Sequence, residues 1–135
     1  MDKKIVLVFN ETTISQNVRE RTHYRERHKA NKDIYTLVNF YAITQKPQKP
    51  FKNAKLTLYR FSNRSLDYDG LVASFKPWVD GLIHAGVIID DNFKVTGKWI
   101  VDQFYRPKSK GPMIKIIIEE TEEGIQWKER QPNQL

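Results

Sequence analysis

The clearest pattern in the chain is a stripe of apolar residues at helical spacing between residues 70 and 86. Its members are Leu71, Phe75, Trp78, Val79, Leu82 and Ile83. They recur on one side of a helix of about four turns. Pro77 interrupts the stripe, and a proline inside a helix either kinks it or begins a second piece. Gly86 follows, and we expect it to end the helix in the left-handed conformation.

Four further segments carry the apolar, β-branched pattern that is typical of strands. They are residues 5–9, 54–61, 93–104 and 113–119. Within the third of these we expect Gly97 to mark a β-bulge. A second amphipathic helix is predicted over 31–42, where apolar residues recur at roughly helical spacing. Two prolines and three lysines in 44–53 indicate a loop.

The order strand, helix, strand, helix, strand, strand predicts the fold class. We expect an α/β (α+β) fold, a small single domain with a mixed β-sheet and two main helices. A chain of 135 residues with 39% hydrophobic residues can bury a core of this kind. The domain would cover residues 1–120, and the polar segment 121–135 would form a loosely attached tail.

Charge and composition limit the kinds of partner that this protein is expected to bind. The chain has 23 Lys and Arg against 16 Asp and Glu, a net charge of +7, which suits nucleic acid or another polyanion. It contains no cysteine, so disulfides and thiolate metal sites are excluded. Its apolar runs are too short to span a bilayer, and its start shows no secretory signal. We therefore expect a cytoplasmic protein with no membrane partner.

Four carboxylates flank the central helix, which is unusual in so basic a chain. Asp67 and Asp69 precede the helix, whereas Asp90 and Asp91 follow the reversal at Gly86. If the reversal brings the two pairs together, they form a site of hard oxygen ligands suited to Mg²⁺ or Mn²⁺. Carboxylate-held Mg²⁺ suits phosphodiester hydrolysis without a protein nucleophile. The alternative is that Asp69 caps the helix and that the other acids are solvated.

The same residues carry a resemblance to a known family. The strings are D-Y-D-G-L at 67–71, D-G-L-I-H-A-G at 80–86 and V-I-I-D-D at 87–91. They resemble the RusA-type Holliday junction resolvases of phages and prophages. The family pattern is D-x-D-N-L, a helix with D-A-L-x-x-A-G, then an apolar triplet and D-D. The resemblance is close from Asp67 to about Val95 and looser elsewhere.

This resemblance implies a RusA-like, homodimeric nuclease. It would bind four-way DNA junctions and nick two opposed strands with Mg²⁺, in DNA recombination and repair, inside a bacterial or phage-infected cell. Asp67, Asp69 and Asp91 match the metal-binding, catalytic aspartates, and Asp90 matches the adjacent acid. No small-molecule cofactor beyond the metal is implied.

The chain departs from the family pattern at two positions. The family's catalytic lysine lies four residues after the second aspartate, where this chain has Ala73, and its asparagine is replaced by Gly70. Lys76 is the nearest lysine, and seven residues separate it from Asp69, nearly two helical turns. Lys76 is therefore either the replacement catalytic residue or a solvated helix lysine.

Basic residues with an aromatic among them form the expected DNA-binding segment. They are Arg19, Arg21, Tyr24, Arg25, Arg27, Lys29 and Lys32. The cations can contact phosphates, and the tyrosine can stack on an exposed base. Two further groups can add to this surface: Lys46, Lys49 and Lys52, and then Arg106, Lys108 and Lys110.

Two other functions stay open on the sequence. One is a nucleic-acid-binding module without catalysis, in which the aspartates are caps and surface acids. The other is a structure-specific nuclease that uses the same residues on other branched DNA, such as flaps or forks. A steep loss of affinity with salt is expected of all three functions, so it does not separate them. Mg²⁺-dependent nicking does separate the non-catalytic binding module from either nuclease.

Overall fold

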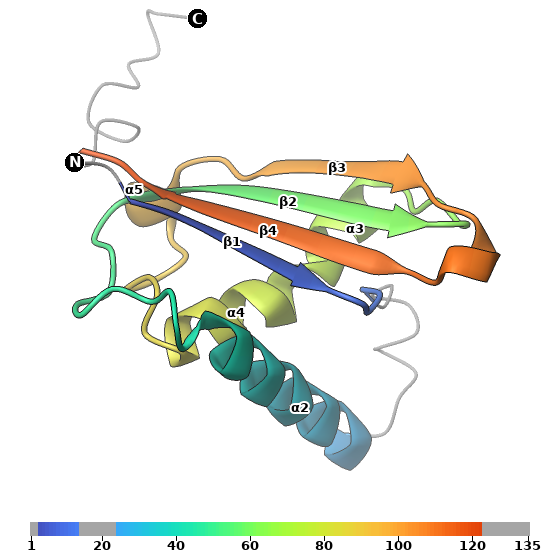
Figure 1. The fold of residues 1–135 in the computed structure, drawn as a ribbon, viewed down its shortest axis with the longest axis horizontal. Coiled ribbons are helices and arrows are strands. Elements are labelled where there is room, and N and C mark those ends of the chain that lie inside the picture. Colours follow the sequence, from blue (N-terminus) through green and yellow to red (C-terminus); the bar gives the residue numbers. More distant parts are fainter. Residues whose placement is uncertain (1–2, 14–23, 123–135) are drawn as a thin grey trace, which may run out of the picture.

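A computed structural model describes residues 3–13 and 24–122, and its centre is a four-stranded mixed sheet. The strands are β1 Lys4–Phe9, β2 Ala54–Ser62, β3 Ile100–Tyr105 and β4 Met113–Glu120. Their spatial order is β1-β4-β2-β3, with β4 antiparallel to both of its neighbours and β2 parallel to β3. The carboxyl ends of β2 and β3 therefore meet at one edge of the sheet (Figure 1).

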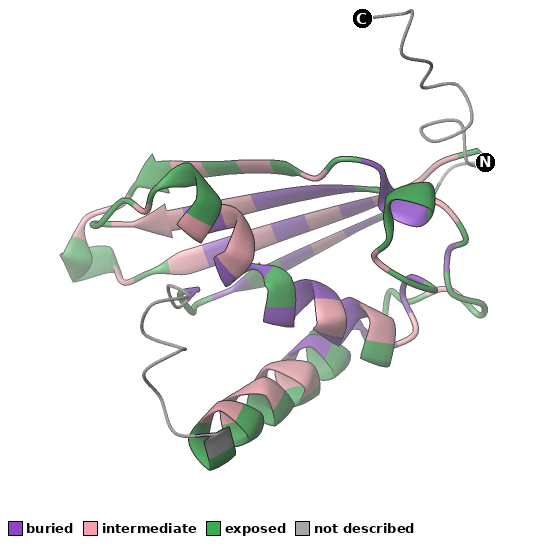
Figure 2. Ribbon diagram, turned by 180° about the vertical axis from the view of Figure 1, so that it is seen from behind, coloured by how far each residue is buried: buried purple, intermediate pink, exposed green. Residues whose placement is uncertain are grey.

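The helices complete a small single α+β domain. They are α2 Tyr24–Ala42, α3 Tyr68–Ser74, α4 Lys76–His84 and α5 Phe93–Thr96, with a 3-10 turn η1 at Lys108–Lys110. Figures 1 and 2 show α2, α3 and α4 on one side of the sheet. The predicted small single α+β domain with a mixed sheet is thus confirmed, but the second of its two predicted main helices is divided into α3 and α4. None of the described helices has the length and apolarity needed to cross a bilayer.

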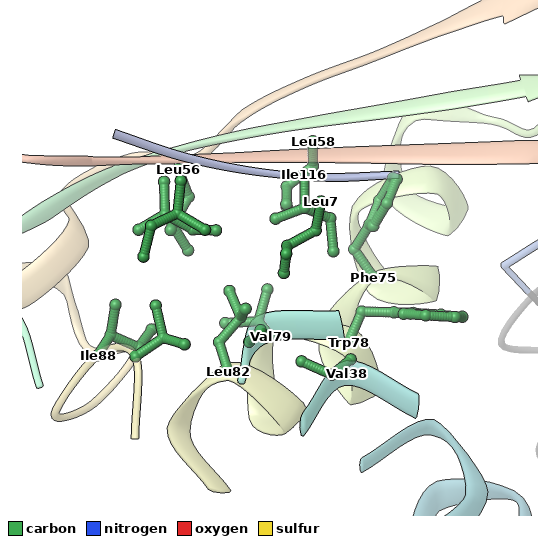
Figure 3. Packing of buried hydrophobic residues seen from close by; sticks show 14 of the residues in the cluster. Leu7, Val38, Leu56, Leu58, Phe75, Trp78, Val79, Leu82, Ile88 and Ile116 are labelled. Carbon is green, nitrogen blue, oxygen red and sulfur yellow. The ribbon is translucent and has the colours of Figure 1, made fainter. Parts of the chain in front are cut away.

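The core lies between the sheet and these helices. Alternate residues of β1, β2 and β4 are buried, as a strand with one covered face requires. Figure 3 shows Leu7, Leu56, Leu58 and Ile116 of the sheet above Val79 and Leu82 of α4. Because the apolar stripe of the central helix supplies the facing layer, burial of that stripe fixes how α3 and α4 lie against the sheet.

Pro77 begins a second helix, as one of the two sequence alternatives proposed. Phe75 ends α3 and also precedes α4, with φ −86° and ψ −11°. Pro77 stands in the first turn of α4, where its missing N–H removes no helical hydrogen bond. The apolar stripe continues across the junction, since Leu71, Phe75, Trp78, Val79 and Leu82 are all buried.

Gly86 reverses the chain after α4, as predicted. Its φ is +79°, a conformation that favours glycine. The Gly86 N–H donates to Ile83 O at 3.0 Å and the Val87 N–H to Leu82 O at 2.9 Å, which are the two bonds of a Schellman motif. The returning segment is held by Phe51, whose N–H donates to Val87 O and whose carbonyl accepts from Ile89 N–H.

The strand predicted over 93–104 is wrong in its first half. Residues Phe93–Thr96 form the short helix α5, and only Ile100–Tyr105 is a strand. Asn92 causes this, because its side chain accepts a hydrogen bond from Val95 N–H at 3.2 Å and caps the helix. Gly97, with φ +61°, ends α5 and does not mark a bulge. Apolar content alone does not distinguish a short helix from a strand.

The predicted helix over 31–42 begins earlier than expected, at Tyr24. Its first turns carry polar residues with good helix propensity and only a short buried side, so periodicity did not reveal them. The strands expected at 5–9, 54–61 and 113–119 and the loop at 44–53 are confirmed. The tail predicted at 121–135 lies outside the described residues from 123 onward.

Replacing Gly81 with alanine is expected to destabilise the domain, because Gly81 is the contact point of α4 with α2. A Cβ atom there would lie 3.0 Å from Val38 Cγ2 and 3.2 Å from Val38 Cβ, and Val38 is fully buried. Overpacking of this kind costs about 1–3 kcal/mol. Denaturant unfolding measures the loss of unfolding free energy.

The matched control is Gly70→Ala in α3, where an added Cβ meets nothing within 4 Å. That change should leave stability equal or higher, because alanine favours a helix over glycine by about 0.5–1 kcal/mol. Equal shifts for Gly70→Ala and Gly81→Ala would contradict the packing explanation.

Candidate functional site

Asp67 and Asp69 stand at the beginning of α3. Asp67 is the N-cap, with φ −61° and ψ 155°, yet its carboxylate accepts no capping hydrogen bond. Asp69 lies in the first helical turn, so the alternative that it is the cap is wrong. Both residues are exposed, and within residues 3–13 and 24–122 neither side chain makes a hydrogen bond or ion pair. Their oxygens are therefore available to a cation from solution.

The backbone just before Asp67 is held by Gln103 of β3. The Gln103 side chain donates through Nε2 to Leu66 O at 2.8 Å and accepts from Leu66 N–H at 3.0 Å. Such a two-bond clamp holds the backbone N–H and C=O of one residue, and so fixes the two successive peptide groups that flank Leu66. Asp67 follows directly, so Gln103 determines where the first carboxylate emerges from the sheet.

Arg60 supports the same loop from the interior. Arg60 is only 6% exposed, and its Nη1 donates to Arg64 O at 2.6 Å. Its Nε donates to Thr13 Oγ1 at 3.0 Å, and Ser74 Oγ donates to the same oxygen at 2.8 Å. Burial lowers the pKa of Arg60, but a guanidinium stays charged at any physiological pH. This network ties Thr13, β2, the loop and the end of α3 together.

Lys76 stands between two carboxylates. Its Nζ donates to Asp80 Oδ1 at 2.8 Å, one helical turn further along α4, and also pairs with Asp91 Oδ2. The reversal at Gly86 thus returns Asp91 to the beginning of α4, across fifteen residues of sequence. The Lys76 side chain is 53% exposed, so it remains accessible to a ligand. Asp80 was not among the predicted site residues, although its i, i+4 spacing from Lys76 was a usable signal.

The ion pairs of Lys76 make stability depend on pH. Partial burial lowers its pKa, but the hydrogen bonds and charges of Asp80 and Asp91 outweigh burial and raise the pKa of Lys76 above its ordinary value. Because the pKa is raised in the folded state, the ion pairs contribute fully to the free energy of unfolding below the ordinary lysine pKa. That contribution is lost as pH rises through the pKa of Lys76 in the folded protein.

We therefore expect the stability difference between wild type and Lys76→Met, measured in EDTA, to shrink above about pH 10.4, the ordinary lysine pKa. Thermal unfolding between neutral and alkaline pH measures it. Lys98→Met, which removes an exposed lysine with no ion pair among the described residues, controls for the loss of a charge. A difference that grows with pH would contradict the expectation.

Asp90 has a different role from Asp91. Its Oδ1 accepts from Asp91 N–H at 2.7 Å and its Oδ2 accepts from Asn92 Nδ2 at 3.0 Å. The hydrogen bond from the Asp91 backbone N–H is the main reason why the pKa of Asp90 is lowered. Asp90 therefore shapes the turn that directs Asp91 toward Lys76.

A cleft of about 360 Å³ adjoins this cluster. Its lining comes from Asn31 of α2, Val72 and Ala73 of α3, Lys76, Pro77 and Asp80 of α4, and Trp99. Ala73 lies one helical turn after Asp69, and residues with that spacing are neighbours on a helix surface. The cleft therefore reaches from Lys76, at the beginning of α4, to a residue that lies one helical turn after Asp69 on α3. Lys76 and Ala73, where the family has its lysine, line the same cleft.

The predicted cluster of four carboxylates is not seen among the described residues. In the described ranges, no three His, Cys, Asp or Glu side chains gather closely enough to hold a metal ion. The structure brings Asp91 to Lys76 and leaves Asp67 and Asp69 exposed at the beginning of α3. That Asp91 joins Asp67 and Asp69 around one ion remains a prediction.

The predicted DNA-binding residues are described only in part. Arg19, Arg21 and the side chain of Tyr24 lie outside the described residues. Arg25, Lys29 and Lys32 are exposed, and their i, i+4, i+7 spacing places them along one face of α2. Arg27 is half-buried instead, because it falls on the opposite face, toward the packed side of the helix. The loop lysines Lys46, Lys49 and Lys52 are exposed.

No model of a protein family matches the chain, and no curated protein matches it significantly.

Proposed function

We propose that this protein is a Mg²⁺-dependent endodeoxyribonuclease that resolves four-way DNA junctions by paired nicks in opposed strands. The observation that carries the proposal is the state of Asp67 and Asp69. A helix-capping aspartate ordinarily accepts a bond from the first turn, and Asp67 accepts none. Asn92 caps α5 in the ordinary way, whereas the Asp67 carboxylate makes no such bond at the beginning of α3.

The donors at the beginning of α3 fit a hard divalent cation. Mg²⁺ commonly binds proteins through one or two carboxylates and takes its other ligands from water and substrate phosphates. Asp67 and Asp69 would supply those carboxylates, and Asp91 would be a third ligand once it exchanged Lys76 for the metal. When bound, Mg²⁺ supplies activation of water and neutralisation of charge at the scissile phosphate.

In this proposal Lys76 also contacts the DNA, in addition to forming ion pairs with Asp80 and Asp91. An ammonium group that carries its proton cannot act as a base, but it can donate a hydrogen bond to a phosphate oxygen or a proton to a leaving oxygen. Asp80 and Asp91 hold its Nζ at the wall of the cleft. Two carboxylates keep the lysine charged and in place until an anionic strand takes their position.

The surface charge favours DNA as the polyanion. The net charge is +7, and Arg25, Lys29 and Lys32 form an exposed basic stripe along α2. Such a stripe can contact consecutive phosphates of a backbone. Each phosphate contact contributes to a steep loss of affinity with salt.

A homodimer is part of the proposal, because two identical sites related by a two-fold axis match a four-way junction. The face of the sheet that no described helix covers supports this. On that face, Val6, Val8, Tyr59, Phe61, Ile100, Phe104 and Ile117 are half-buried or exposed. Light scattering would show the dimer as twice the chain mass of 16.0 kDa, and a mass of one chain at nuclease-active concentrations would refute it.

One observation favours the second candidate, a DNA-binding module without catalysis. Lys76 forms ion pairs with Asp80 and Asp91, and paired charges of this kind also occur as purely structural features. In that case the protein would bind branched DNA but leave it uncut.

A nicking assay separates the two. Synthetic four-way junction, fork and linear duplex of equal length are incubated with the protein, with Mg²⁺, with Mn²⁺ and with EDTA. The proposal expects paired nicks in the junction that require the metal and are absent in EDTA. Binding without nicking in either metal would establish the non-catalytic module, and faster cutting of the fork would reassign the substrate.

A further inference from the structure

A pocket at the carboxyl ends of β2 and β3 is not used by the chemistry proposed above. Its volume is about 270 Å³. The residues Ser62 to Ser65, in the turn after β2, form one side, and Gln103, Phe104 and Tyr105 of β3 form the other. The ends of parallel strands are a common place for ligand sites in open sheets. Only Leu66 separates this turn from Asp67.

One basic residue, Arg64, lines the pocket, and three more follow β3 in the next turn. Residues 60–66 and 103–113 contain Arg60, Arg64, Arg106, Lys108 and Lys110 but no Asp or Glu. The basic turn is ordered, because Arg106 donates to Gly111 O at 2.8 Å and to Lys110 O at 3.3 Å. Figure 1 shows the orange turn between β3 and β4, which includes η1, beyond the carboxyl end of β3. An anion is therefore attracted to this edge.

The aromatic side of the pocket is unusually exposed. Tyr105 is 76% exposed, and among the described residues its ring contacts no other ring. An exposed aromatic ring beside cations is the arrangement by which proteins stack a base and hold its phosphates.

We propose that this pocket binds one unpaired nucleotide of a single DNA strand, with the base on Tyr105 and the adjacent phosphates at Arg64 and η1. A paired base has both faces covered within the helix stack, so only an unpaired one can enter. The volume lies just below the range of about 300–1,000 Å³ for drug-sized ligand sites, which suits a single base. The inference rests on the proposed function only in taking DNA as the partner.

This site would explain a preference for branched substrates. Forks and flaps carry unpaired strands, and linear duplex does not. Ser65, which lines the pocket, is followed in the chain by Leu66 and Asp67. Capture of a single strand in the pocket would therefore bring the DNA to the beginning of α3. Selection of the branch and cutting would then be carried out by neighbouring but separate residues.

The test measures binding of a fluorescent single strand of about ten thymidines, a length within the usual range for such sites. A hairpin duplex without unpaired ends is measured alongside, and EDTA prevents cutting. Tyr105→Ala should weaken single-strand binding about tenfold or more, the effect of one lost base–aromatic stack, and leave duplex binding unchanged. Tyr105→Phe should restore it, because stacking needs the ring and not the hydroxyl.

Two further variants sharpen the result. Phe40→Ala removes a ring that is 72% exposed on α2 and should have no effect on single-strand binding. Arg64→Gln should reduce the slope of log affinity against log salt by about one, as for one lost phosphate contact. Tyr105 is exposed, so its replacement should leave the melting temperature unchanged, and melting of each variant verifies this.

Wild-type affinity in Tyr105→Ala, an equal loss for the hairpin, or an equal loss in Phe40→Ala would overturn the inference. No binding of the single strand by wild type would overturn it as well. The proposed function is judged separately by metal-dependent nicking. A protein that nicks junctions but binds the single strand independently of Tyr105 keeps the function and loses this site, and the converse result keeps the site alone.

Discussion

Replacing Asp69 with asparagine is expected to abolish Mg²⁺-dependent nicking while binding of a four-way junction stays the same or becomes tighter. The side chain keeps its size but loses the charge that would hold the cation, so the rate should fall by about a hundredfold or more, as for one lost electrostatic group at a reacting centre. Binding should not suffer, because one negative charge that repels the DNA backbone is removed.

Single-turnover nicking and gel-shift binding in EDTA measure the two effects separately. Asp69 is exposed in the first turn of α3, and its side chain makes no hydrogen bond among the described residues. Its replacement should therefore not unfold the domain. Asp33→Asn is the matched control, since it removes the same charge from an exposed position on α2. If Asp69→Asn cuts as fast as wild type, the carboxylates at α3 hold no catalytic metal.

Replacing Gln103 with leucine is expected to lower nicking by about ten- to a hundredfold, although Gln103 itself carries no catalytic chemistry. That range is typical of residues that orient metal ligands from behind. The change removes both hydrogen bonds to Leu66 and so loosens the backbone from which Asp67 emerges. The apparent Mg²⁺ requirement should rise.

The chain offers a closely matched control for this positioning role. The Gln45 side chain makes the same kind of clamp on β1, donating to Val6 O at 3.2 Å and accepting from Val6 N–H at 3.4 Å. β1 and β3 are the opposite edges of the sheet. Gln45→Leu should therefore leave both nicking and its Mg²⁺ dependence unchanged. Equal effects of the two substitutions would reduce Gln103 to a structural residue.

The two substitutions in the site also distinguish different failures of the proposed function. If Asp69→Asn abolishes nicking and Gln103→Leu does not, the metal site exists but its first ligand is positioned by other contacts, such as that of Arg60 with Arg64 O. If neither change affects nicking, the reaction takes place elsewhere. If wild type does not nick, the basic stripe of α2 and the pocket at Tyr105 remain as binding surfaces to be tested.

Local features of the fold could be predicted because their causes are local. The apolar stripe from Leu71 to Leu82 requires a helix buried on one side, Pro77 interrupts a continuous helix, and Gly86 accepts a positive φ. The failure at 93–96 has the same origin. There a single capping bond from Asn92 decided the conformation, and apolar content concealed it.

The sequence by itself therefore determined the fold class, the reversal after α4 and the identity of the acidic residues that flank the helix. Only the tertiary structure decided which of those residues meet. Lys76 pairs with Asp91, Gln103 clamps Leu66, and Arg60 reaches Thr13 across 47 positions of sequence. Such contacts depend on the order of strands and on how helices pack against them. Those in turn follow from the summed burial of many side chains, which no local pattern of residues encodes.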